Sequence, residues 1–291
     1  MWEALQFEFL RNALMAGLLA SIACGVIGTL VVVNRIVFLA GGIAHAAYGG
    51  IGLACFLGLP YMFGTFGFAL VVAMIMAAMT VRDRHRSDTV IGVLWAVGMA
   101  LGVVLLDLTP GYNVDLMSYL FGSILTVPAT DLWAMAAVVT VVTALVFRFY
   151  SAFVAMSYDA EFARLRGVPV GGLYFLLLGM ISISVVIVIQ VVGLILVIAM
   201  LTIPPYIAEK FSDSLWGMML LSSLISCILT LFGLWISYRW NLTSGATIIL
   251  VNGAAFFLLI LGERLRARHR RMKLACRPNP PLEDDPREAV R

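Results

Sequence analysis

The stretch that decides the fold is residues 36–57, IVFLAGGIAHAAYGGIGLACFL. It is apolar and rich in glycine, and it is long enough for one helix to cross the hydrocarbon core of a bilayer. Near its middle lies His45, the only histidine in any apolar segment of the chain. A polar side chain at membrane depth costs free energy, and residues of this kind usually serve a function. The stretch therefore predicts a membrane-spanning helix with a functional site near its centre.

The composition extends this prediction to the whole chain. Of the 291 residues, 62% are hydrophobic and only 12% are charged. A water-soluble protein of this length cannot hide so much apolar surface in its core. The apolar segments are continuous runs and lack the alternation of membrane β-barrel strands. We therefore expect an all-α, polytopic membrane protein that contacts lipid, and nothing in the composition suggests a nucleic-acid partner.

Polar and turn residues divide the chain into eight or nine predicted spans. Seven are expected at 12–33, 36–58, 61–81, 89–107, 131–150, 215–237 and 243–262, and the apolar block 171–211 is expected to hold two more, joined by a tight turn near 190–193. The shorter apolar segment 117–127 ends at Pro128 and predicts a short or re-entrant helix at the membrane edge. Residues 151–170 are expected to form a polar loop.

The basic residues predict the orientation of the chain and the nature of its C-terminal segment. With the N-terminus outside and nine spans, the inner side receives every one of the 19 Lys and Arg residues except Arg11 and Arg239. Cytoplasmic loops are enriched in Lys and Arg, so we expect an outer N-terminus and a cytoplasmic C-terminus. Residues 1–262 are predicted to form the transmembrane domain, and residues 263–291 a basic, proline-containing cytoplasmic tail that is partly disordered.

The polar loop contains the signals of a short helix between residues 158 and 170, YDAEFARLRGVPV. An aspartate can cap its start, an acidic residue lies in its first turn, basic residues lie in its last turn, and a glycine follows. The residues singled out for this helix are Asp159, Glu161, Phe162, Ala163, Arg164, Leu165 and Gly167. Its phenylalanine and leucine can form an apolar face, which either lies on lipid or docks a cytoplasmic partner.

Five segments, taken in order, resemble one known family. They are Ala44-His45-Ala46 after Arg35, SDTVIG at 87–92, VDLMSYLFGSILTV at 114–127, DAEFARLRG at 159–167, and QVVG at 190–193 with Pro204 beyond it. These segments are similar, in the same order, to those of the metal-ion permeases of bacterial ABC importers, which move zinc, manganese or iron. The resemblance covers the chain as far as Arg264.

The resemblance implies a set of partners and a location. The short helix at 159–167 would dock on a cytoplasmic ABC ATPase dimer, and an extracytoplasmic metal-binding protein would deliver the ion to a permease homodimer in the bacterial inner membrane. The chain contains no GxxxxGK[ST] phosphate-binding loop, so ATP must be bound and hydrolysed by a separate subunit. The permease itself is not expected to be an enzyme or to hold a permanent cofactor.

The same resemblance makes His45 the candidate contact for the transported ion. In the family an aspartate commonly stands at the position of Gly41 and a serine at that of Ala44, and this chain keeps only the histidine. Imidazole suits zinc, which is the first choice of ion, with manganese or iron as alternatives. Asp107, at the outer end of a span, either helps to receive the cation or is a solvated charge. The alternative for His45 is a histidine that is hydrogen-bonded between helices.

Three glycines are expected to allow close packing of the helices. Gly98 and Gly102 have GxxxG spacing, and Gly49 is the third.

Two other functions compete with that of an ABC permease. A secondary transporter driven by an ion gradient would usually show paired intramembrane acids or broken helices in repeated halves, and neither is evident. An intramembrane or metal-dependent protease would need a GxGD or HExxH sequence, and both are missing.

Overall fold

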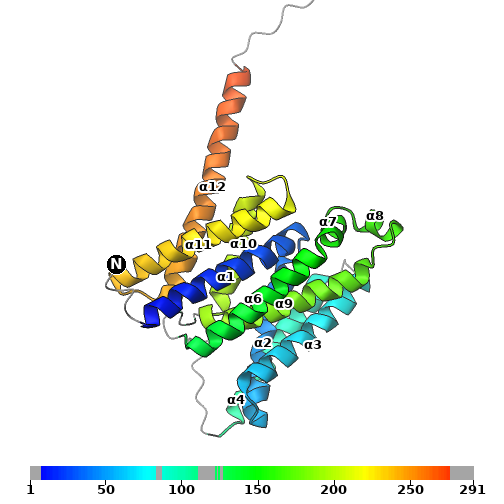
Figure 1. Ribbon diagram of the computed structural model, residues 1–291, viewed down its shortest axis with the longest axis vertical. Helices are drawn as coiled ribbons and strands as arrows, with labels where there is room; N and C mark the ends of the chain where they lie inside the picture. The colour runs from blue at the N-terminus through cyan, green and yellow to red at the C-terminus, as the bar shows by residue number, and fades with distance from the viewer. Residues whose placement is uncertain (1–7, 83–86, 111–121, 123, 125–126, 276–291) are drawn as a thin grey trace, which may run out of the picture. The chain divides into compact units, whose positions relative to one another are not determined.

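The computed structural model describes residues 8–82, 87–110, 122, 124 and 127–275 (Figure 1). Every regular element in this part of the chain is helical. The helices are α1 Glu8–Val33, α2 Val37–Leu57, α3 Tyr61–Arg82, α4 Ser87–Asp107, α6 Ala129–Arg148, α7 Tyr150–Tyr158, α8 Ala160–Leu165, α9 Val170–Val192, α10 Leu194–Glu209, α11 Leu215–Trp240 and α12 Ser244–Ala275. The short or re-entrant helix predicted at 117–127 falls almost wholly outside the described residues.

Eight of the described helices are long and apolar enough to cross a membrane. They are α1, α2, α3, α4, α6, α9, α11 and α12, and the shorter apolar helix α10 has 16 residues. At 1.5 Å per residue α10 is about 24 Å long, somewhat less than the roughly 30 Å thickness of a hydrocarbon core. The prediction of an all-α membrane protein with eight or nine spans is confirmed.

The apolar block 171–211 divides at a single residue. Helix α9 ends at Val192, α10 begins at Leu194, and Gly193 between them has φ 86° and ψ 160°. Only glycine adopts this backbone conformation readily, because any side chain would clash with the neighbouring peptide groups. The predicted break near 190–193 is therefore present, and it is set by one glycine.

The expected polar loop at 151–170 is wrong in its first half. The preceding span ends at Arg148, and after Phe149 the chain forms the further helix α7. Phe153 and Met156 of α7 are buried, and α7 contacts both α8 and α9. Residues 150–156 carry no charge, and burial of their apolar side chains stabilises a helix where sequence polarity predicted a loop.

Of the eight long helices, α1, α2 and α9 are the inner ones. Within the 18-residue apolar segment of each of these three helices, 67%, 72% and 72% of the residues are buried inside the protein. In α3, α4, α6, α11 and α12 the same share is only 22–33%. Most of the apolar surface of these five helices is therefore not covered by this chain itself. The helix that carries His45, α2, is one of the three inner ones.

Helices α2 and α4 run parallel and pack backbone against backbone. A Cβ atom added to Gly98 would lie 2.9 Å from the Cα of Ala46, and one added to Gly102 would lie 2.6 Å from the carbonyl oxygen of Tyr48. A Cβ atom on Gly49 of α2 would in turn lie 2.7 Å from the carbonyl oxygen of Gly98. Small residues at such crossings let membrane helices approach closely. The three glycines singled out in the sequence thus meet at one contact.

Replacing Gly98 with leucine is expected to separate α2 from α4 and to lower the stability of the permease by about 1–3 kcal/mol, the usual cost of overpacking. Gly92 on the same helix is a matched control, because no atom lies within 4 Å of its added Cβ. Thermal unfolding of the detergent-solubilised variants should show a lower midpoint for Gly98→Leu and no comparable shift for Gly92→Leu. Equal midpoints would contradict the close contact.

The contacts divide the chain into two units, residues 1–253 and 254–291. Helix α12 begins in the first unit, where Ile248 packs against Gly233 of α11, and continues to Ala275 in the second. The predicted tail at 263–291 is therefore helical over its first part, 263–275.

Candidate functional site

His45 is held by a hydrogen bond within its own helix. The imidazole Nδ1 lies 2.9 Å from the carbonyl oxygen of Gly41, one turn earlier in α2. A carbonyl oxygen can only accept, so Nδ1 carries the hydrogen and the neutral ring keeps its lone pair on Nε2. Metal-binding histidines in proteins usually show this arrangement, with one nitrogen donating to a carbonyl and the other facing the metal.

The His45 side chain lies on the one open face of an otherwise buried stretch of helix. Phe38, Gly41 and His45 are partly or fully exposed, whereas Ala44 and Tyr48 beside them are buried. Beyond the open face lies α10, whose Ile198 has the only atom close to an added Cβ on Gly41, at 4.0 Å. The face therefore has room for a cation and for a larger side chain at position 41.

An indole ring from α4 stacks on the imidazole. The ring centroids of His45 and Trp95 are 4.0 Å apart, with an angle of 32° between the ring planes. Trp95 is itself fixed, because its Nε1 donates to the Sδ of Met99 at 3.1 Å and its ring lies 6.0 Å from that of Phe38. Sequence reasoning missed this residue, although its place three residues before Gly98 puts it on the packing face of α4.

The structure does not bring Asp107 to His45. Asp107 is the last residue of α4 and is exposed, twelve residues beyond Trp95, which corresponds to about 18 Å along the helix. Among the described residues no three His, Cys, Asp or Glu side chains come together as a metal site. The arrangement at His45 therefore offers a single imidazole nitrogen to a passing cation.

The short helix α8 forms as its sequence signals predicted. The Asp159 carboxylate accepts hydrogen bonds from the backbone N–H groups of Glu161 and Phe162, at 3.1 and 2.9 Å. At the other end Gly167 has φ 80°, and the next residue donates its N–H to the carbonyl oxygen of Ala163 at 3.0 Å. Both ends of α8 are thus stabilised locally by side-chain and glycine caps.

Helix α8 turns one small residue inward and its large apolar residues outward. Ala163 is 1% exposed, whereas Phe162 is 53% and Leu165 is 88% exposed. The Arg166 guanidinium lies over the Phe162 ring, 5.2 Å from its centroid. A nearly bare leucine beside charged side chains adds nothing to the packing of this chain, and such a surface is suited to contact with a partner.

Helix α7 connects α8 to the rest of the bundle. The Asn34 side-chain amide, just after α1, donates to the hydroxyl of Ser157 at 2.9 Å and to the carbonyl oxygen of Leu30 at 2.8 Å. The Tyr150 hydroxyl accepts from the backbone N–H of Trp216 at 3.1 Å, at the start of α11. Side-chain hydrogen bonds of this segment thus link α7, and through it α8, to the ends of α1 and α11.

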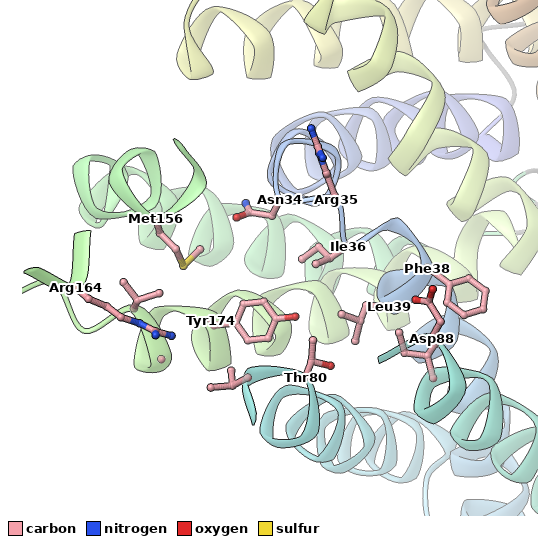
Figure 2. Close-up of a pocket in the computed structure, with 14 residues that line it drawn as sticks. Asn34, Arg35, Ile36, Phe38, Leu39, Thr80, Asp88, Met156, Arg164 and Tyr174 are labelled. Carbon is pink, nitrogen blue, oxygen red and sulfur yellow. The ribbon is translucent and has the colours of Figure 1, made fainter. Parts of the chain in front are cut away.

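A cavity of about 280 Å³ lies beside α8 (Figure 2). It is lined by Asn34, Arg35, Ile36, Phe38, Leu39, Thr80, Val81, Asp88, Ile91, Met156, Arg164, Val170, Gly171 and Tyr174. Figure 2 shows the Arg164 side chain of α8 extending toward Tyr174, with Asp88 and Phe38 at the other end. The lining residue Phe38 also contacts the ring of Trp95, whereas neither Trp95 nor His45 lines the cavity.

Known proteins share both the sequence and this fold. The model of the ABC 3 transport family matches residues 6–263. An uncharacterised membrane protein of Synechocystis sp. is 48% identical, over 91% of this chain and 94% of its own. The manganese transport system membrane protein MntC of Listeria monocytogenes is 31% identical, over 88% of this chain and 91% of its own.

A solved structure agrees with these sequence matches. PsaBC from Streptococcus pneumoniae, solved in complex with a Fab, superposes with a TM-score of 0.79 at 32% identity, and covers 88% of this chain and 92% of that chain. The residues matched by the family model, 6–263, include the helix that holds His45 and helix α8. The chain therefore belongs to the ABC 3 transport family, the permease subunits of metal-ion ABC importers whose ATPase is a separate subunit.

Proposed function

We propose that this chain is the permease of an ATP-driven importer of divalent metal ions, with His45 as the contact for the ion inside the membrane. The observation that carries the proposal is the orientation of the imidazole. Nδ1 is bound to Gly41, and Nε2 is left for a cation on the open face of an inner helix. A single neutral nitrogen holds a divalent ion weakly, and weak binding allows an ion to leave the site as well as enter it.

The ion we propose is zinc. The name of the Listeria relative specifies manganese, which prefers carboxylate and carbonyl oxygen, whereas imidazole nitrogen suits zinc. At the position one turn before the histidine this chain has Gly41, which supplies no carboxylate. The donor at the open face is therefore better matched to zinc than to manganese.

A second copy of the chain would complete the path. The open face of α2 exposes Phe38, Gly41 and His45 in a helix that is otherwise mostly buried. An imidazole facing lipid would be costly, and polar groups in membrane helices usually face a partner or a water-filled cavity. We infer that this face lines an ion path between two permease copies, with both histidines close to the path.

The distribution of charge supports an orientation with α8 in the cytoplasm. Arg35 and Arg164 line the same cavity, so α8 and the loop before α2 lie at one end of the bundle. This end would face the cytoplasm of a bacterium, where Lys and Arg residues are enriched. The N-terminus and the binding protein that delivers the ion would then be outside the inner membrane, and the C-terminal tail inside.

In this arrangement the partner ATPase would act on α8. Closure of an ATPase dimer upon ATP binding would displace both copies of α8, and α7 would transmit the displacement through its contacts with α1 and α11. The path between the permease copies would open alternately to the two sides. The chain contributes the path and the docking surface, and the ATPase contributes the energy.

The test is metal uptake by liposomes that contain the complete complex. We expect uptake of ⁶⁵Zn that requires ATP, the ATPase and the external binding protein, and the mass of the purified complex should fit two permease copies. A tenfold excess of manganese should inhibit zinc uptake far less than the same excess of unlabelled zinc. Uptake without ATP would contradict the importer, and equal inhibition by the two ions would contradict the choice of zinc.

A further inference from the structure

We propose that the indole of Trp95 takes over part of the role that a carboxylate at position 41 would have, by stabilising the positive charge of the metal-bound imidazole of His45. The inference rests on the proposed function, because it requires that His45 bind the ion. Nothing in the sequence motifs points to Trp95, and its place in the site follows only from the packing of α4 on α2.

The first step of the argument is the geometry of the two rings. The His45 and Trp95 centroids are 4.0 Å apart and the ring planes are inclined by 32°, so the imidazole lies over the indole face. The hydrogen bond from Nδ1 to Gly41 fixes the imidazole, and the bond from Trp95 to Met99 fixes the indole. Both rings are therefore held in the stacked position before an ion arrives.

The second step is electrostatic. A divalent cation bound at Nε2 withdraws electrons from the imidazole and makes the whole ring positive. The face of an indole is negative, and among aromatic side chains tryptophan attracts a cation within about 6 Å of the ring centroid most strongly. At membrane depth little water screens this attraction, so Trp95 favours the metal-bound form of His45 over the empty one.

The third step concerns the missing carboxylate. Gly41 faces the same open side as His45, and an added Cβ there would meet only Ile198 at 4.0 Å. A carboxylate would fit, and one turn from the imidazole it would bind a divalent ion strongly. The indole gives a weaker, uncharged form of the same stabilisation. The two groups should therefore substitute for each other, which a merely structural tryptophan would not do.

The experiment measures two quantities with the full complex, the dissociation constant for zinc and the zinc concentration that half-saturates uptake. Trp95→Leu should raise both about tenfold, equivalent to a loss of about 1.4 kcal/mol of binding free energy. Trp95→Phe, which keeps an aromatic face, should raise them less. Adding Gly41→Asp to the Trp95→Leu chain should restore zinc affinity. The matched control is Trp133→Leu on α6, where the indole is 79% exposed, and it should change neither value.

A second readout uses a variant that keeps the packing volume. Zinc should change the tryptophan fluorescence of the native complex, and this change should disappear in Trp95→Phe. Native zinc affinity in Trp95→Leu, an assembled double variant whose affinity is not restored, or a fluorescence change that survives in Trp95→Phe would each overturn the role of Trp95. Zinc binding that is unaffected by His45→Ala would instead overturn the proposed ion contact itself, so the two failures are distinguishable.

Discussion

Replacing Leu165 with aspartate is expected to abolish copurification of the ATPase subunit with the permease, and with it ATP-driven metal uptake. Leu165 is 88% exposed on α8 and contributes almost nothing to the packing of this chain. Burying a leucine against a partner is worth about 1.5–3 kcal/mol, and a carboxylate placed in the same apolar contact adds a desolvation cost. The combined effect corresponds to at least a hundredfold loss of affinity for the ATPase, at about 1.4 kcal/mol per tenfold.

The matched control is Leu59→Asp, which changes another exposed leucine in the turn between α2 and α3. Leu59 is 51% exposed and follows the end of α2 that lies away from Arg35 and the α8 cavity. Copurification and thermal unfolding should be normal for Leu59→Asp, and thermal unfolding should also be normal for Leu165→Asp. An intact, active complex with Leu165→Asp would favour the other reading of α8, a helix that lies on lipid without docking a partner.

Replacing His45 with alanine is expected to lower the rate of zinc uptake by at least tenfold while leaving assembly with the ATPase intact. The variant removes the only nitrogen donor at the open face of α2, whereas the ring that it deletes bonds only to Gly41 of its own helix and stacks on Trp95. The measurement is ATP-dependent ⁶⁵Zn uptake by liposomes, with the ATPase activity of the same complex recorded beside it.

Cys55→Ala is the control for this variant, because Cys55 is another metal-capable, half-buried side chain of α2. Its uptake should match that of the native complex. Native uptake by His45→Ala would remove His45 from the ion path. Loss of assembly would contradict the prediction by showing that the ring is needed for packing.

The features that the sequence predicted correctly depend on local physics. A continuous apolar run must satisfy its backbone hydrogen bonds internally when lipid surrounds it, so each run forms a helix whatever its neighbours are. Gly193 divides α9 from α10 because its conformation is one that side chains disfavour. Asp159 and Gly167 limit α8 because their hydrogen bonds are made within a few residues.

The features that the sequence did not predict depend on contacts between distant segments. Helix α7 was expected as a loop, and it is stabilised by burial of Phe153 and by the bond from Asn34 at the end of α1. The contact of Trp95 with His45 likewise joins two different helices. No local pattern encodes these contacts, because they follow from how whole helices pack.

His45 illustrates both kinds of feature, those that local sequence determines and those that only tertiary packing determines. The sequence alone determined that His45 lies within a membrane helix, that its own helix lacks a carboxylate one turn earlier, and that a GxxxG face elsewhere would pack closely. Only the tertiary structure decided which ring lies against it, because Gly98 and Gly102 let α4 approach until Trp95 stacks on the imidazole. The sequence determines the neighbours of His45 along its own helix. The close packing of α2 and α4 determines which residue of another helix lies against it.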